Sequence, residues 1–396
     1  MDANIIIIAL AVTILGSYLF DLIGNKVKIP SVVLLIGTGI LLGELARYVG
    51  FTIPYADTFL STFGTVGLIL IVLEGSLDLN LTRDKLPLIG KTLLSAVAIM
   101  AVTIGAISTL LAYLFDVGFT QAVINAIPVS IISSAVAIPA AAGLMKKDKE
   151  FVVYESSFSD IIGIVLFNYF TIHSEVSVGT SFTELRNLIL IVLVAVVFSL
   201  FVGYFIDKVT HHVKFVPILA FLLLAYGFGK YYHLSPLLLI LIFGLILNNF
   251  ILLLRGPLVD LVNVTKMKTD MTQFKQLVAE AVFFARTFFF ILFGYEADIY
   301  QMANTETLLI GGILFIIMVL VRVGGLLFIE PRSMNPLVFF APRGLITILL
   351  FLSIPAEASM PIMNEGLLLI VIFLSLILLI LGNRFAEKPK VETPAH

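Results

Sequence analysis

The sequence predicts an all-α polytopic membrane protein with about 13 transmembrane helices. Hydrophobic residues make up 60% of the chain, charged residues only 13%, and the mean hydropathy is +1.12. A soluble domain could not bury so much apolar surface. The alternating polarity that is typical of a membrane β-barrel is absent from the sequence. These observations leave a bundle of membrane-spanning helices as the predicted fold.

Thirteen apolar segments are long enough to span a membrane, and polar or Pro- and Gly-rich breaks separate them. The first segment follows no basic leader and ends in no small-residue cleavage site, so we expect it to be retained as a helix. The predicted spans are 3–23, 29–47, 58–79, 87–115, 119–145, 154–173, 184–207, 215–231, 235–253, 275–298, 305–329, 336–354 and 364–384.

The distribution of basic residues predicts an orientation. With the N-terminus outside, eighteen of the 24 Lys and Arg residues fall in loops on the inner side, and three fall in outer loops. Positive charge collects on the cytoplasmic side of membrane proteins. We therefore expect a multi-pass protein of the cell (inner) membrane, with 385–396 forming a short cytoplasmic tail.

The two halves of the chain resemble each other. The third span closes on Gly75 and Asp78, and the tenth closes on Gly294 and Asp298. The corresponding spans are seven helices apart, an odd number, so the two repeats would be inverted in the membrane. Inverted repeats are typical of alternating-access transporters. The alternative is a chance similarity among Leu-rich helices.

Proline predicts a break in two of the spans. In the fifth, Pro128 and Pro139 flank the pair Ser133–Ser134, and the twelfth contains Pro342-Arg343-Gly344. Proline removes a backbone donor and frees carbonyl groups, which are suitable ligands for a partly dehydrated cation. Because the two spans are counterparts in the repeat, we expect a pair of crossed broken helices. Two ordinary proline kinks are the alternative.

Four polar residues lie on one face of the sixth span: Glu155, Ser156, Ser159 and Asp160. The two carboxylates are about 7.5 Å apart along a helix axis. Ionisable residues inside a membrane are costly and normally mark an ion or proton pathway. Glu155 could instead be an interfacial residue at the start of the helix, where a negative charge suits the helix dipole.

Buried arginines need partners, because the guanidinium group does not lose its charge. The arginines inside predicted spans are Arg286, Arg322 and Arg343, and the acids are Glu74, Glu155 and Asp160. We expect Arg343 to pair with Glu155 and Arg322 to lie near Asp160. Glu74 and Arg286 would form a third pair, because the third and tenth spans are related by the repeat.

These motifs together resemble the cation–proton antiporter superfamily, on its electroneutral sodium/proton exchanger branch of the bacterial type. Glu155-Ser156 followed by Ser159-Asp160 is similar to the family's ion-binding helix, and Ser133–Ala137 to its first broken helix. Arg322 and Ala341–Gly344 also match family motifs. The resemblance extends to about residue 384. It implies an ion site at Asp160, Ser156, Ser159, Ser133, Ser134 and Glu155, with Asp160 holding the cation.

Two positions depart from the family pattern. Ser134 replaces an aspartate, and Ser159 replaces the asparagine before the ion-binding aspartate. Both keep a hydroxyl oxygen and lose either a charge or an amide. Sodium is the first expectation for the cation, and lithium and potassium remain open.

The resemblance implies secondary active transport by competition. Asp160 would bind either one proton or one alkali cation, so exchange would be electroneutral and serve pH homeostasis. A core part, about 87–173 and 305–384, would move against a dimerisation part, about 1–79 and 215–298, in which Gly39-x-x-x-Gly43 could allow close helix packing. A homodimer surrounded by membrane lipid is expected.

Other functions fit less well. The chain has no cysteine and no HExxH motif, which argues against thiolate or metal-dependent enzymes, and we expect no cofactor and no nucleic-acid partner. A channel would require a selectivity filter or rings of like-charged residues, and neither is evident in the sequence. The main alternative is a sodium- or proton-coupled transporter of an organic anion on the same architecture.

Overall fold

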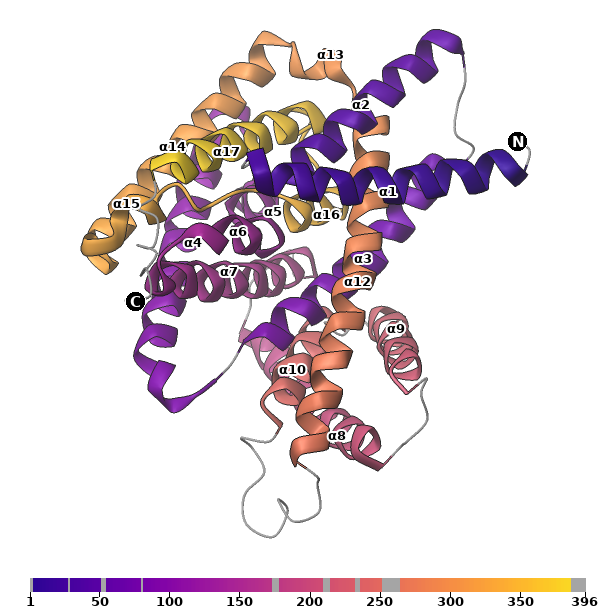
Figure 1. Ribbon diagram of the computed structural model, residues 1–396. Coiled ribbons are helices and arrows are strands. Elements are labelled where there is room, and N and C mark those ends of the chain that lie inside the picture. The colour runs from indigo at the N-terminus through magenta and orange to yellow at the C-terminus, as the bar shows by residue number, and fades with distance from the viewer. Residues whose placement is uncertain are drawn as a thin grey trace, which may run out of the picture. The chain divides into compact units, whose positions relative to one another are not determined.

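The computed structural model describes residues 3–27, 29–50, 55–79, 81–172, 178–208, 214–231, 236–250 and 264–385. Helices form nearly all of these segments, and no strand occurs among them (Figure 1). Residues 386–396, which make up nearly all of the predicted cytoplasmic tail, lie outside the described ranges. The prediction of an all-α protein is confirmed.

Each predicted span corresponds to a helix or to a pair of short helices. The first half contains α1 (Ala3–Val27), α2 (Ser31–Val49), α3 (Ala56–Asp78), α4 (Leu86–Phe115), α5 (Phe119–Ser130), α6 (Ser134–Ala140) and α7 (Lys146–Ile172). Then follow α8 (Val178–Lys208), α9 (Val216–Tyr231), α10 (Pro236–Asn248), α12 (Val264–Glu296), α13 (Ile299–Met302), α14 (Thr305–Ile329), α15 (Met334–Leu337), α16 (Leu345–Leu352) and α17 (Glu365–Phe385).

Hydropathy located the apolar part of each helix better than its ends. Helix α7 begins at Lys146 and α12 at Val264, earlier than the predicted 154 and 275. The added turns are polar, so they continue the helix without adding to the apolar run. Within the described ranges, nine helical segments have the length and composition to cross a membrane, and α9 and α10 are shorter apolar helices.

The chain divides into two compact units. One comprises Met1–Leu60, Gly90–Gly163 and Phe290–His396, and the other Ser61–Ile89 and Ile164–Phe289. In the first unit α14 and α17 lie side by side, and α5 contacts α16 (Figure 1). In the second unit α10 packs against α8 and α9. The division into a core and a dimerisation part stays a prediction.

The small residues of α2 allow a close helix contact inside the first unit. A Cβ atom added to Gly39 would lie only 2.9 Å from the Cα of Gly294, at the end of α12. One turn further along α2, Gly43 faces the carbonyl of Tyr295. Any larger side chain at these positions would push the backbones apart. Close packing through Gly39 and Gly43 is thus confirmed, as a contact within one chain.

Candidate ion-binding site

Two interrupted helices meet in the first unit. Helix α5 ends at Ser130 and α6 begins at Ser134, with extended backbone at Ile131 and Ser133 between them. The second interruption separates α15 from α16, which begins at Leu345. The Ser133 N–H donates to the Pro342 carbonyl over 2.9 Å, so the two interruptions touch. The structure therefore has the pair of broken helices that the prolines predicted.

The positions of the prolines refine this prediction. Pro128 lies inside α5 and Pro139 inside α6, whereas the unwound residues are Ile131 to Ser133 between them. Gly344 is required at the crossing, because a Cβ atom there would lie 2.8 Å from the Ser133 Oγ atom. The break is therefore set by the close approach of two backbones, and the prolines lie within the helices beside it.

Two side chains of α7 satisfy the unwound backbone. The Ser159 Oγ atom accepts a hydrogen bond from the Ile132 N–H over 2.9 Å. Asp160 Oδ2 accepts one from the Ser134 N–H over 3.1 Å. Buried N–H groups outside regular helices need such partners. Ser159, Asp160 and the backbone of the Ser133–Ser134 pair are therefore brought together, as the sequence predicted.

Asp160 keeps one oxygen without a partner. Its side chain is buried, and within the described residues Oδ1 accepts no hydrogen bond. The buried Ser133 Oγ atom likewise has no hydrogen-bond partner there. Leaving a buried carboxylate oxygen unpaired costs free energy. A proton or a small cation at Oδ1 would remove that cost.

Glu155 pairs with Arg322, not with Arg343 as predicted. The Arg322 Nη1 and Nη2 atoms donate to the two Glu155 carboxylate oxygens over 3.2 and 2.9 Å, and Ser95 Oγ donates to Oε1 over 2.6 Å. Arg322 also donates to the Leu337 carbonyl over 2.7 Å, next to the second break. The prediction failed because it matched residues by type, whereas the packing of α14 brings Arg322 to the Glu155 carboxylate. Glu155 is thus a buried, saturated carboxylate.

Arg343 belongs to the second interruption, its side chain reaches the end of α5, and it forms no salt bridge within the described residues. Its Nε atom donates to the Val129 carbonyl at the end of α5 over 2.6 Å, and its Nη1 atom to the Ala341 carbonyl over 3.0 Å. The C-terminal end of a helix carries partial negative charge, which suits a cation. Arg343 therefore binds the end of the broken helix α5, and the predicted position of Arg322 near Asp160 is replaced by the ion pair with Glu155.

Three further predicted residues, Ser156, Glu74 and Arg286, take other partners. Ser156 donates to the Val152 carbonyl of its own helix over 2.7 Å and, among the described residues, makes no hydrogen bond with Asp160. Glu74 and Arg286 belong to the second unit, where they interact electrostatically, in line with the predicted pair. In the same unit the Lys275 Nζ atom lies 3.9 Å from an Asp78 carboxylate oxygen, about one helical turn along α3 from Glu74.

The sequence reasoning missed several polar partners. Ser95 is one of several hydroxyl residues in α4, whereas Ser375 is the one hydroxyl residue in the apolar helix α17. The Ser375 Oγ atom accepts a hydrogen bond from the Arg343 N–H over 2.9 Å. Its isolation in an apolar helix is the signal that could have found Ser375; nothing in the pattern of α4 singles out Ser95. The structure also joins Glu330 to Lys91 and Lys147. Burial raises the pKa of Glu330, but the hydrogen bonds and charges of the two lysines outweigh it, so the net pKa is lowered.

The comparisons with known proteins agree with this arrangement. The sodium/proton antiporter MjNhaP1 of Methanocaldococcus jannaschii, solved at pH 8, superposes with a TM-score of 0.74 at 18% identity, over 96% of this chain and 97% of that chain. An electron-microscopy structure of the same antiporter gives a TM-score of 0.71 at 18% identity, over 96% and 95%.

No curated protein sequence is similar enough to this chain to count as a relative. The profile of the family described as "Sodium/hydrogen exchanger, transmembrane" matches residues 8–384. That match covers nearly the whole chain and includes both broken helices and α7. The chain therefore belongs to the sodium/hydrogen exchanger family of multi-pass membrane transporters.

Proposed function

We propose that this transporter exchanges one alkali cation, sodium first, for one proton at Asp160, without net charge movement. The observation that carries the proposal is the contrast in hydrogen bonding on α7. Asp160 is buried beside a broken helix and has a vacant Oδ1 atom, whereas Glu155 is saturated by Arg322 and Ser95. A group that must bind and release an ion needs such a vacancy.

The proposed mechanism is competition for the Asp160 carboxylate. Either a proton or a cation neutralises it, and the neutral form can pass a low-dielectric barrier that the bare anion cannot. Ser133 is the nearest further ligand by our proposal, because its buried Oγ atom has no partner in the described residues. Ser134, Ser156 and Ser159 would supply oxygen atoms around the same turn, and Glu155 would act only through its ion pair.

The stoichiometry follows from the number of carboxylates that can change charge. Arg322 donates a hydrogen bond to each Glu155 carboxylate oxygen and balances its charge, so Glu155 offers no vacant oxygen to an exchanged ion. Ser134 occupies the position where a second acid could have stood. One cation would therefore replace one proton.

The test is reconstitution into proteoliposomes with an internal pH dye. Addition of sodium should move protons, and lithium and potassium, added in turn, would give the selectivity. Clamping the membrane potential should leave the final pH gradient unchanged, because one net charge is worth about 2.3 kcal/mol per 100 mV. A final gradient that follows the potential would refute the one-carboxylate mechanism. Proton movement driven by an organic anion, and by no cation, would support the alternative substrate that the family match disfavours.

We propose further that the protein is a homodimer in the cell membrane, with its N-terminus outside and its C-terminus in the cytoplasm. The core would contain 87–173 and 305–384, which include both broken helices, and it would move against 1–79 and 215–298. The chain has no cysteine, so single introduced cysteines can report the orientation. An impermeant maleimide should label Tyr48→Cys from outside and Lys149→Cys only after permeabilisation. The reverse pattern would overturn the orientation.

A further inference from the structure

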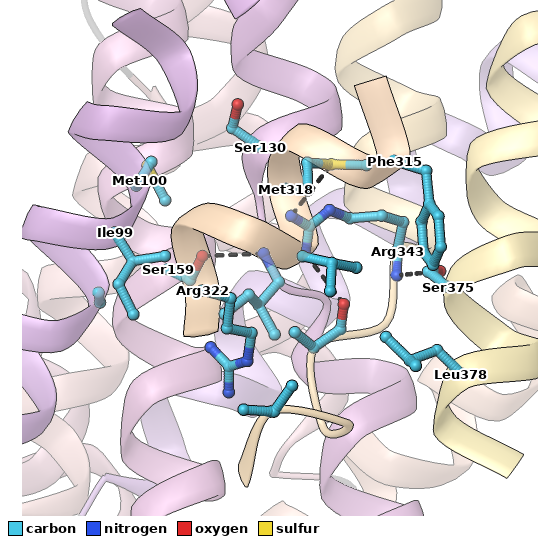
Figure 2. Close-up of a pocket in the computed structure, with 15 residues that line it drawn as sticks. Ile99, Met100, Ser130, Ser159, Phe315, Met318, Arg322, Arg343, Ser375 and Leu378 are labelled. Atoms are coloured by element: carbon cyan, nitrogen blue, oxygen red, sulfur yellow. Dashed lines mark hydrogen bonds between the residues drawn. The ribbon is translucent and has the colours of Figure 1, made fainter. Parts of the chain in front are cut away.

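A small buried cavity lies beside the broken helices, within the first unit (Figure 2). Its volume is about 30 Å³, which is room for one or two water-sized groups. Its polar lining consists of Ser130, Ser159, Ser375, Arg322 and Arg343, and the rest of its wall is apolar. None of the residues that line it is an acid. Most of the wall is apolar, so a bound group would depend on the few polar side chains that reach the cavity.

The spare hydrogen-bonding capacity of this wall consists of donors. The Arg343 Nη2 atom has the Met318 thioether sulfur, at 3.3 Å, as its one acceptor in the described residues, and a thioether is a weak acceptor. The Ser159 oxygen accepts from Ile132, but no described group accepts its hydroxyl proton. Ser130 and Ser375, by contrast, donate to carbonyls of their own helices. What is missing from the cavity is an acceptor.

The charges on the cavity wall also indicate that an acceptor is missing. The Arg322 charge is balanced by Glu155, whereas Arg343 is 5% exposed and has two backbone carbonyls as its main acceptors. Arg343 is repelled by Arg322 and, more weakly, attracted by Glu155, whose carboxylate is already paired with Arg322. A buried cation without a full counter-charge is costly. An acceptor that also carried negative charge would satisfy the free donors and the excess charge together.

We propose that this cavity binds one small monovalent anion of the size of chloride, held by Arg343 Nη2 and Ser159 Oγ. The anion is a resident ligand and not a transported ion. Figure 2 shows Arg343, from the unwound segment before α16, and Ser159, from α7, among the residues that line the cavity, with Ser375 Oγ accepting a hydrogen bond from the Arg343 N–H. The small volume selects against sulfate and phosphate.

The site would be linked to the cation site, and this step rests on the proposed role of Asp160. Ser159 precedes Asp160 directly, so a bare Asp160 carboxylate would repel an anion in the cavity. A cation or proton on Asp160 removes that repulsion. Coupling between two sites is reciprocal, so the bound anion would raise the affinity of Asp160 for its cation or proton by the same factor by which the cation or proton raises the affinity for the anion.

The direct test is anomalous diffraction from crystals of the purified full chain grown in bromide. One bromide peak is expected in the cavity, near the Arg343 guanidinium. Water without bromide there would overturn the proposal. This measurement does not depend on transport, so loss of the peak with intact sodium/proton exchange would refute the anion site alone. A peak in a protein whose exchange survives Asp160→Asn would refute the proposed function alone.

Thermal unfolding with chloride or gluconate, at equal ionic strength, gives a second readout. Chloride should raise the Tm by about 2 °C or more, since a ligand stabilises the state that it binds. Val319 lines the cavity, and Val319→Ile adds a methyl group that should abolish the chloride effect. Val321→Ile, a change of the same size on the same helix at a residue outside the lining, should keep it. An equal chloride effect in both variants would contradict the site.

Discussion

The two carboxylates of α7 lie five residues apart on one helix and have opposite surroundings. Glu155 accepts three side-chain hydrogen bonds, two of them from a guanidinium group. Among the described residues, Asp160 accepts a hydrogen bond from the Ser134 N–H, also interacts with the Ser134 hydroxyl, and keeps Oδ1 vacant. Both are buried. Burial alone therefore does not distinguish a structural carboxylate from one that can exchange an ion.

The neighbouring helices explain the difference. Glu155 faces continuous helices α4 and α14, whose side chains bring Ser95 and Arg322 to its oxygens. Asp160 faces the interruption between α5 and α6, where the neighbouring atoms belong mainly to backbone. Side chains of two helices supply hydrogen-bond donors to both Glu155 oxygens, whereas the unwound backbone supplies a single donor to Asp160 and leaves its Oδ1 atom open to an ion. The break thus creates the vacancy.

The largest effect on stability is expected at Glu155, whose two carboxylate oxygens both accept hydrogen bonds. Arg322→Ala should destabilise the protein by about 3–5 kcal/mol, because Glu155 would remain buried without its counter-charge. Unfolding in detergent by denaturant or heat measures the loss. The double variant with Glu155→Leu should lose less than the sum of the two single changes. The matched cycle of Arg343→Ala with Glu155→Leu should show the smaller coupling, and equal coupling in both cycles would contradict the observed pairing.

Asp160→Asn should abolish cation-driven proton movement and leave the Tm unchanged or higher. The amide can still accept from the Ser134 N–H but can neither titrate nor balance a cation. Exchange in proteoliposomes should fall at least about tenfold, equivalent to roughly 1.4 kcal/mol. Asp116→Asn is the matched control, since Asp116 is exposed and its φ of 50° suits asparagine. Retained exchange in Asp160→Asn would place the ion site elsewhere.

Ser159→Ala tests whether the break depends on α7. The Ile132 N–H would lose its acceptor, so we expect a loss of about 1 kcal/mol in stability together with slower exchange. Ser156→Ala is the control for stability, because its hydroxyl donates only to carbonyls of its own helix. Equal Tm values for the two variants would show that Ser159 does not support the unwound segment.

The smallest effect is expected at Glu330, a saturated carboxylate with partly exposed lysine partners. Glu330→Gln should cost less than about 1 kcal/mol at pH 7, since solvent screens Lys91 and Lys147. The pKa of Glu330 is lowered on folding, so its contribution is present above the unfolded pKa of about 4.3 and is lost as pH falls through the folded pKa. The difference between the two melting curves should therefore begin to shrink as pH falls below about 4.3 and disappear at lower pH. A difference that stayed constant as the pH was lowered well below that value would contradict the ion pairs.

Much of this protein could be predicted from local patterns. Apolar runs located the spans, and Pro128, Pro139 and Pro342 marked the two interrupted helices, because hydropathy and missing backbone donors act on neighbouring residues. The polar face of α7 likewise followed from helical periodicity. The helix ends at Lys146 and Val264 did not, because polar turns continue a helix without an apolar signal.

The sequence by itself determined that three intramembrane arginines must find partners, since a buried charge without compensation is too costly. Only the tertiary structure decided which partners they take. Arg322 reaches Glu155, and Arg343 reaches the end of α5. The rotation of α7 and α14 about their axes, and the position of the α15–α16 interruption along them, set the distances between these charged groups and their partners. Those positions depend on packing between helices far apart in the chain. No local pattern encodes them, and so the vacancy at Asp160 became visible only in the fold.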